Sequence, residues 1–228
     1  MLDAAGHGAM QIRSGASVNM TGVTITGGSG DSGGGVSVEG SSTSVRMTRC
    51  DVVGNTAVDG GGISLEDGEM TLEDCTVNAN LATGVGGGVS VRGSTSVLRL
   101  AGVTIYSNSA QRGGGISVDG GTVVMSEGTF VRTNTASTGD SVDVLSGTVV
   151  YQLGQNFPPG HYLPDPLDQH VYQLPTRPLN VDLPLACGAG VLGSADLALQ
   201  TSADCAGPCP AGRLCQKATT VPKACPAG

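Results

Sequence analysis

Apolar residues in the first two thirds of the chain recur in short alternating runs, and each run follows a cluster of glycines. The clearest run, Gly-Gly-Gly-Val-Ser-Val at residues 33–38, returns at 60–65, 86–91 and 113–118 with Val, Ile or Leu at the apolar positions. The third glycines are 27, 26 and 27 residues apart. Alternation with period two predicts strands with one buried face, and the fixed step predicts a repeat architecture.

Two weaker copies flank these four repeats. Met10-Gln11-Ile12 precedes the first repeat by the same step, and Val142-Asp143-Val144 follows the last one. We therefore expect about five to six coils.

Each repeat also contains a second apolar segment, which ends near an asparagine. These segments are Met20, Val23 and Ile25; Met47, Cys50 and Val52; Leu72, Cys75 and Val77; Leu100, Val103 and Ile105; and Met125, Gly128 and Phe130. The asparagines are Asn55, Asn80, Asn108 and Asn134, with Gly28 in the equivalent place of the first repeat. We expect the asparagines to adopt positive φ at tight turns and to pass side-chain amide hydrogen bonds from coil to coil.

Short strands, regular turns and a fixed period together predict an all-β fold, a right-handed parallel β-helix over residues 1–151. Each coil should consist of three short strands, with equivalent residues stacked about 4.8 Å apart. Two inward columns follow from the alternation: Val36, Ile63, Val89, Ile116 and Val142, and Val38, Leu65, Val91, Val118 and Val144. The structural turn glycines are Gly33, Gly34, Gly35, Gly60, Gly61, Gly62, Gly86, Gly87, Gly88, Gly113, Gly114 and Gly115.

The composition narrows the range of functions. The chain has 38 glycines, two phenylalanines and no tryptophan, so its core must be thin and aliphatic. A formal net charge of −8 argues against a nucleic-acid partner. No apolar run approaches the length of a membrane-spanning segment, and residues 1–4 lack the basic and apolar regions of a signal peptide. Residue 1 begins inside a coil motif and residue 228 ends inside a cysteine-rich module, so we expect the parent protein to be longer.

Cysteines concentrate at the C-terminal end. Residues 187–228 contain Cys187, Cys205, Cys209, Cys215 and Cys225, which predicts a small disulfide-rich module from an oxidising compartment. Because five is an odd number, one of them should pair outside this chain. Residues 152–186 are rich in proline and should form a connector that covers the open end of the β-helix.

Cys50 and Cys75 fall at the same position of successive coils. Two alternatives remain open for this pair, which are buried free thiols and a disulfide.

Four stretches resemble three known families. Residues 2–28, LDAAGHGAMQIRSGASVNMTGVTITGG, resemble the opening coils of β-helix proteins of the pectin-lyase-like superfamily. VVGNTAVDGGGIS (52–64) and IYSNSAQRGGGIS (105–117) resemble the polymorphic outer membrane protein repeat, although Val52, Val77 and Ile105 replace its preferred Phe. The C-terminal cysteine spacing resembles the ephrin-receptor-like module, here incomplete. Together these resemblances imply a large surface protein of the kind found in algae and other protists.

Two enzyme-like strings have structural explanations. GDSGGG at 30–35 resembles the serine-protease nucleophile string around Ser32, but it is one instance of the repeated glycine turn. Gly6-His7-Gly8 matches a polygalacturonase string but lacks the aspartate pair that such hydrolysis requires.

A pectate-lyase-like site would need stacked acidic residues and a basic residue on one face. Asp51, Glu73 and Asp74 with Arg46 and Arg49 are the nearest approach to it. A solvated charged face is the simpler interpretation of these five residues.

We therefore predict a non-enzymatic extracellular or cell-surface repeat protein, which acts as a spacer or as an adhesion or glycan-binding face. Outward Ser37, Ser64, Ser90, Ser117 and Asn19 are expected to contact glycans or surface proteins. Asn19-Met20-Thr21 is also an N-glycosylation sequon. We expect no catalytic residue, cofactor or metal site. The alternative is a fragment of a pectin-lyase-like lyase or hydrolase whose active site lies outside this chain.

Overall fold

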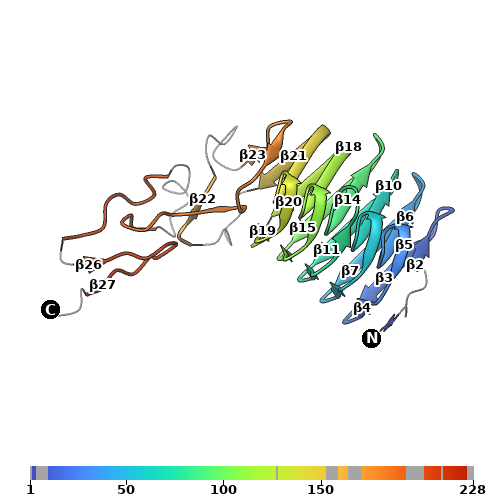
Figure 1. Ribbon diagram of the computed structural model, residues 1–228, viewed down its shortest axis with the longest axis horizontal. Helices are drawn as coiled ribbons and strands as arrows, with labels where there is room; N and C mark the ends of the chain where they lie inside the picture. The colour runs from blue at the N-terminus through green and yellow to red at the C-terminus, as the bar shows by residue number, and fades with distance from the viewer. Residues whose placement is uncertain are drawn as a thin grey trace.

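The computed structural model describes residues 2–3, 10–126, 128–152, 159–163, 171–193, 203–211 and 213–224. These residues form strands and turns, with no helix in the described ranges. The strands stack into a parallel β-solenoid of about five turns, and the C-terminal region extends from one end of it (Figure 1). The all-β parallel fold expected from the repeats is confirmed.

The coils follow one another with the same order of strands. The first three described coils contain β2 (Met10–Ile12), β3 (Ser17–Thr21), β4 (Thr24–Thr26) and β5 (Ser29–Ser32); β6 (Val36–Glu39), β7 (Ser44–Thr48), β8 (Asp51–Val53) and β9 (Thr56–Asp59); and β10 (Ile63–Glu66), β11 (Glu69–Glu73), β12 (Thr76–Asn78) and β13 (Leu81–Ala82). The next are β14 (Val89–Arg92), β15 (Val97–Ala101), β16 (Thr104–Tyr106) and β17 (Ser109–Arg112); β18 (Ile116–Ser126), β19 (Phe130–Arg132) and β20 (Thr135–Thr138); and β21 (Val142–Gln152). β1 (Leu2–Asp3) pairs with β4.

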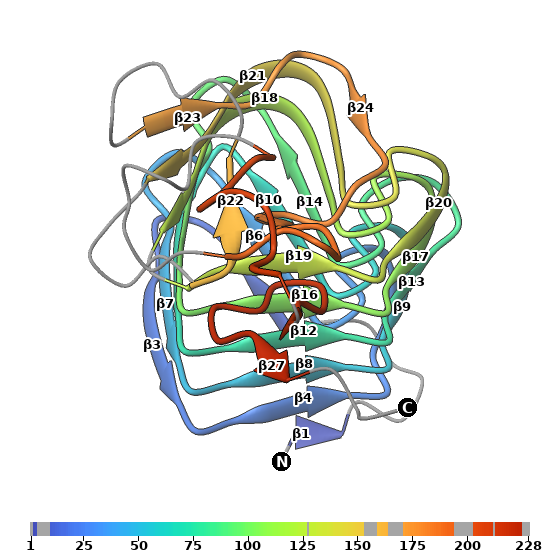
Figure 2. The same ribbon diagram turned by 90° about the vertical axis from the view of Figure 1, so that its left-hand side faces the viewer.

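The first four of these coils have four strand segments each, so the expectation of three was wrong for them, and the fifth has three. Equivalent strands form a six-stranded sheet through β1, β4, β8, β12, β16 and β19, and a five-stranded sheet through β5, β9, β13, β17 and β20 (Figure 2). The remaining two ladders are joined into one sheet, because β18 and β21 run without a break through the corner that interrupts earlier coils. The extra strand arises from bends that apolar spacing alone did not reveal.

The corners between strands are made by residues in the left-handed region. At the corner that enters the six-stranded sheet these are Gly22, Arg49, Asp74, Gly102 and Gly128, and at the corner that leaves it Gly27, Gly54, Ala79, Ser107 and Thr133. The asparagines directly follow the second corner, so the expectation that they themselves take positive φ was wrong. The preceding residue takes the turn, which leaves the asparagine side chain directed inward.

The inward columns have the register expected from the sequence. Ile63 pairs with Val36 and Val89, and Leu65 pairs with Val38 and Val91. The weak first copy aligns in the same way, since Met10 pairs with Val36. These residues form one continuous aliphatic core, in which every member of the two columns is at most 2% exposed.

One apolar assignment was wrong by one residue. Gly128 and Phe130 were expected to point inward, but Thr129 and Val131 are fully buried and Phe130 faces outward. Val131 pairs with Ile105. The corner before β19 is one residue longer than its counterparts, which shifts the alternation that follows.

The residues after the last coil cover the end of the core. β23 (Val171–Gln173) and β24 (Pro178–Leu179) pair antiparallel with β21, and Val131 and Leu183 exchange two backbone hydrogen bonds of 2.8 Å. The apolar side chains of Leu163, Leu174, Leu179 and Leu183 are buried against the solenoid. Because β23 and β24 run antiparallel to β21, the parallel stacking of coils ends at this point.

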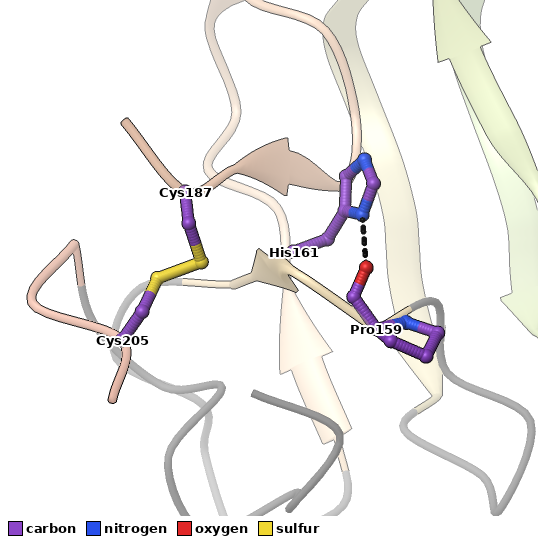
Figure 3. Close-up of a disulfide and its surroundings, with 4 residues drawn as sticks. All are labelled: Pro159, His161, Cys187 and Cys205. Atoms are coloured by element: carbon purple, nitrogen blue, oxygen red, sulfur yellow. Dashed lines mark hydrogen bonds between the residues drawn. A yellow bond between two sulfur atoms is a disulfide. The ribbon is translucent and has the colours of Figure 1, made fainter. Parts of the chain in front are cut away.

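The C-terminal region is held together by disulfides. Cys187 bonds to Cys205 and Cys209 bonds to Cys215 (Figure 3 shows the first pair). Two short antiparallel strand pairs are β22 (His161–Tyr162) with β25 (Leu185–Ala186) and β26 (Arg213–Leu214) with β27 (Lys223–Ala224). The fifth candidate, Cys225, lies outside the described residues. Two disulfides within about 30 residues compensate for the small apolar core of this region.

Candidate functional site

The serines between the inward columns are buried, which corrects the expectation that they form a display face. Ser37, Ser64, Ser90 and Ser117 are 1–4% exposed, although their side chains lie on the outer face of the strands. The first glycine of each triplet causes this burial. At Gly33, Gly60, Gly86 and Gly113 the chain turns with positive φ, and an added Cβ would lie under 3.0 Å from the carbonyl three residues later. The corner therefore folds back over the serine and shields it.

The other two glycines of each triplet meet different neighbours. An added Cβ on Gly61 would lie under 3.0 Å from the carbonyl of Gly87 in the next coil, and one on Gly62 would lie 2.9 Å from the side-chain nitrogen of Asn80. The triplet Gly60, Gly61 and Gly62 thus meets three separate packing constraints.

The column of buried serines ends, in the last coil, at an aspartate that forms an ion pair. This aspartate, Asp143, is fully buried, and Arg112 donates a hydrogen bond of 2.9 Å from Nε to its Oδ2. The Oδ1 atom of Asp143 has no hydrogen-bond partner among the described residues. Arg112 is 44% exposed at the side chain, so this pair lies where the buried column meets solvent.

The four asparagines form a hydrogen-bonded ladder inside the solenoid. The side-chain oxygen of Asn80 accepts from the backbone and side-chain nitrogens of Asn55, each at 3.0 Å, and Asn108 and Asn134 repeat this pattern. Each side-chain amide also donates to a backbone carbonyl, for example Asn80 to Val52 at 3.0 Å. The ladder satisfies polar groups that would otherwise be unpaired in the core, so its role is structural.

The two cysteines of the solenoid are free thiols. Cys50 and Cys75 are buried in successive coils, and the Cys75 sulfur accepts from the Cys50 backbone nitrogen at 3.3 Å. Burial raises the pKa of the Cys75 thiol to about 11. A thiol that remains protonated at neutral pH is a poor nucleophile, which disfavours redox or covalent chemistry at Cys75.

Three of the five residues considered for a lyase-like site already have side-chain partners in the structure. Arg46 forms an ion pair with Glu73, which also accepts a hydrogen bond from Thr48, and Thr76 donates to Asp51. Across the described ranges, no three His, Cys, Asp or Glu side chains form a group that could hold a metal ion. His7 lies outside those ranges, and Asn19 is exposed on β3 as its sequon requires.

The outer face of the five-stranded sheet is formed mainly by hydroxyl and aliphatic side chains. We call it the five-stranded face; its outward positions are Ser29, Asp31, Thr56, Val58, Leu81, Thr83, Ser109, Gln111, Thr135 and Ser137. Asp31 is the sole charged residue among them, and six of the ten bear hydroxyl groups. Ser29 pairs with Thr56, Thr56 with Leu81, and Leu81 with Ser109, so hydroxyl and aliphatic groups lie in straight rows.

This face also contains a shallow depression of about 210 Å³, lined by Ser29, Gly30, Thr56, Ala57, Val58 and Thr83. Val58 and Leu81 are 47% and 46% exposed. At the edge of the sheet, Asp59 and Arg112 are in ion pairs with Arg92 and Asp143, so little net charge borders the rows. The arrangement can offer hydrogen bonds and aliphatic contacts to an extended neutral ligand.

Sequence reasoning missed this strand because its apolar positions are alanines. The inward residues are Ala57, Ala82, Ala110 and Ala136. Each follows its ladder asparagine by two residues, so the string Asn-x-Ala recurs in four coils. That recurrence was the available signal, and it indicates a place where only a small side chain fits beside the core.

Comparisons with protein-family models, curated proteins and solved structures found no match for this chain. Among the described residues, no helix has the length and apolar character needed to cross a membrane.

Proposed function

We propose that the chain is a non-enzymatic, extracellular or cell-surface repeat protein, and that its five-stranded face binds a neutral polysaccharide. The observation that supports this most is the row structure of that face, with hydroxyl and aliphatic side chains on strands about 4.8 Å apart in a chain of net charge −8. The two disulfides fit an oxidising extracellular location.

The proposed contacts are individually weak. None of the ten outward positions of the face is aromatic, so no ring is available for stacking on a sugar. Binding then depends on several hydroxyl contacts repeated along the rod, and its strength should grow with the length of the polysaccharide. A rigid solenoid suits this role because its rows are fixed before the ligand arrives.

Affinity electrophoresis through gels containing hydroxyethylcellulose, arabinoxylan or mannan tests the proposal. The variant T56E/T83E places two charges on the five-stranded face, and T26E/N78E places two on the six-stranded sheet as the matched control. Retardation by at least one polymer should be lost in the first variant and retained in the second. Absence of retardation in all three gels, or equal loss in both variants, contradicts the proposal.

The enzyme alternative is tested separately. We expect no release of unsaturated or reducing ends when the protein is incubated with polygalacturonate, with and without Ca²⁺. Turnover above that of a heat-treated sample would contradict the non-enzymatic part of the proposal.

A further inference from the structure

A second concave site lies where the last coil meets the disulfide-bonded region. It has a volume of about 210 Å³ and is lined by Phe130, Arg132, His161, Asp182, Leu183, Pro184, Ala186, Lys217 and Ala218. At about 30 Å³ of liquid volume per molecule, this is room for roughly seven waters. The space suits one compact ligand group rather than a length of polymer.

The walls of this pocket are joined by backbone hydrogen bonds. Cys187 donates to Gly160 and Ala218 donates to Cys187, both at 2.8 Å, while β22 pairs with β25 beside the Cys187–Cys205 disulfide (Figure 3). The Thr133 backbone nitrogen donates to Asp182 Oδ1 at 2.8 Å. The pocket is therefore preformed by segments from both parts of the chain.

The charged groups of the pocket favour an anion. Arg132 and Lys217 both line it, and neither forms an ion pair in the described part of the chain. His161 adds an imidazole whose Nδ1 lies 3.1 Å from the carbonyl oxygen of Pro159 (Figure 3). The sole carboxylate of the lining is Asp182, and one of its oxygens already accepts the Thr133 N–H.

Phe130 holds the arginine in a useful orientation. The guanidinium carbon of Arg132 lies 5.3 Å from the centroid of the Phe130 ring, and the His161 ring meets the same phenylalanine edge-on at 5.4 Å. A guanidinium that stacks on a ring keeps its N–H donors at its periphery, in the geometry that binds two oxygens of a sulfate or phosphate group.

We propose that this pocket binds a tetrahedral oxyanion, namely a sulfate or phosphate ester on a sugar, with Arg132 and Lys217 as the anion ligands. The site is separate from the five-stranded face and does not depend on the function proposed for that face. The proposal assigns no reaction to the pocket. An oxyanion site at the junction would let the end of the rod recognise a charged substituent that its neutral face does not bind.

Isothermal titration calorimetry with galactose 6-sulfate, galactose 6-phosphate and galactose tests the assignment. We expect either ester to bind at least tenfold more tightly than galactose, and affinity to fall as salt is added because the cations are exposed. The tighter of the two esters identifies the source of the oxyanion. Equal binding of all three sugars, or binding of none, overturns the proposal.

Two variants locate the site. R132Q/K217Q should weaken ester binding at least tenfold, while R99Q/K223Q removes the same charge from exposed positions outside the pocket and should change it less than twofold. A186L narrows the cavity without altering charge and should also weaken binding. Thermal unfolding of each variant establishes that it is folded, and an equal loss in R99Q/K223Q would show a general charge effect and refute the site.

Discussion

Replacing Asn80 by alanine should destabilise the solenoid far more than the loss of one polar side chain on its surface. The side chain of Asn80 takes part in four hydrogen bonds, two with Asn55, one with Val52 and one with Asn108. Its removal leaves the Asn55 backbone nitrogen with no acceptor, which costs about 1–3 kcal/mol when buried, and each other lost bond costs about 0.5–1.5 kcal/mol. Because some partners keep a second bond, we expect about 3 kcal/mol in total.

The assay is urea unfolding followed by far-UV circular dichroism, with thermal unfolding alongside. A loss of about 3 kcal/mol corresponds to roughly 6–12 °C in the melting temperature of a domain of this size. Asn78→Ala is the matched control, because Asn78 lies two residues earlier with its side chain on the outside of β12, and it should change stability by less than about 0.5 kcal/mol. Asn134→Ala, at the end of the ladder, removes three bonds and should cost less.

The result that would refute this reasoning is equal stability of the Asn80→Ala and Asn78→Ala proteins. Such a result would mean that water or a shift of the coils satisfies the orphaned groups, and that stacking of the aliphatic columns alone sets the register.

Three further predictions concern single positions. In urea unfolding, Gly86→Ala should lower the free energy of unfolding by at least about 2 kcal/mol more than Gly22→Ala does. Both glycines have positive φ, but only Gly86 has a carbonyl within 3.0 Å of the added Cβ. Equal losses of stability would refute the clash. Arg112→Gln should lower the free energy of unfolding by about 3 kcal/mol because it leaves the Asp143 charge buried and unpaired. The double variant R112Q/D143S should recover most of the lost stability, since serine occupies the position of Asp143 in other coils. Absence of recovery would contradict the role given to this ion pair. Because burial raises the pKa of Cys75 to about 11, the folded state holds this proton more tightly than the unfolded chain. The resulting stability is full below pH 9.0 and is lost as the pH rises toward 11, so the urea midpoint should fall more steeply there for the native protein than for Cys75→Val, and parallel curves would contradict it.

The parts of the fold that repeat in sequence could be predicted from it. Val36, Ile63 and Val89 reveal their shared column because a stacked solenoid gives equivalent residues identical surroundings. The ladder asparagines were found for the same reason. In contrast, the pairing of Cys187 with Cys205 could not be deduced, since the spacing of several cysteines permits many connectivities.

The candidate site could be predicted less well, because alternation reports which face of a strand a residue occupies and not what covers that face. Ser64 alternates with Ile63 and Leu65 and was therefore placed outside, where it does lie. Its burial depends on the left-handed turn at Gly60, which brings backbone over the outer surface of the strand. This close approach forms only in the folded corner, and the pattern of apolar and polar residues along the sequence does not report it.

The same corner bears on the choice of the five-stranded face as the proposed binding surface. A glycine corner that closes over the serines leaves no accessible row on the strand that follows it. On the face formed by β7, β11 and β15, Arg46 and Glu73 form an ion pair across the coils, and Glu69 and Arg99 are exposed charges, so that face suits a neutral ligand less well. The strand before the glycine triplet contributes only small inward side chains, such as Ala57 and Ala82, to the core. The repeat therefore constrains the outward residues of that strand little. The hydroxyl rows therefore occur where the repeat constrains the sequence least, which is where a binding surface can change without cost to the core.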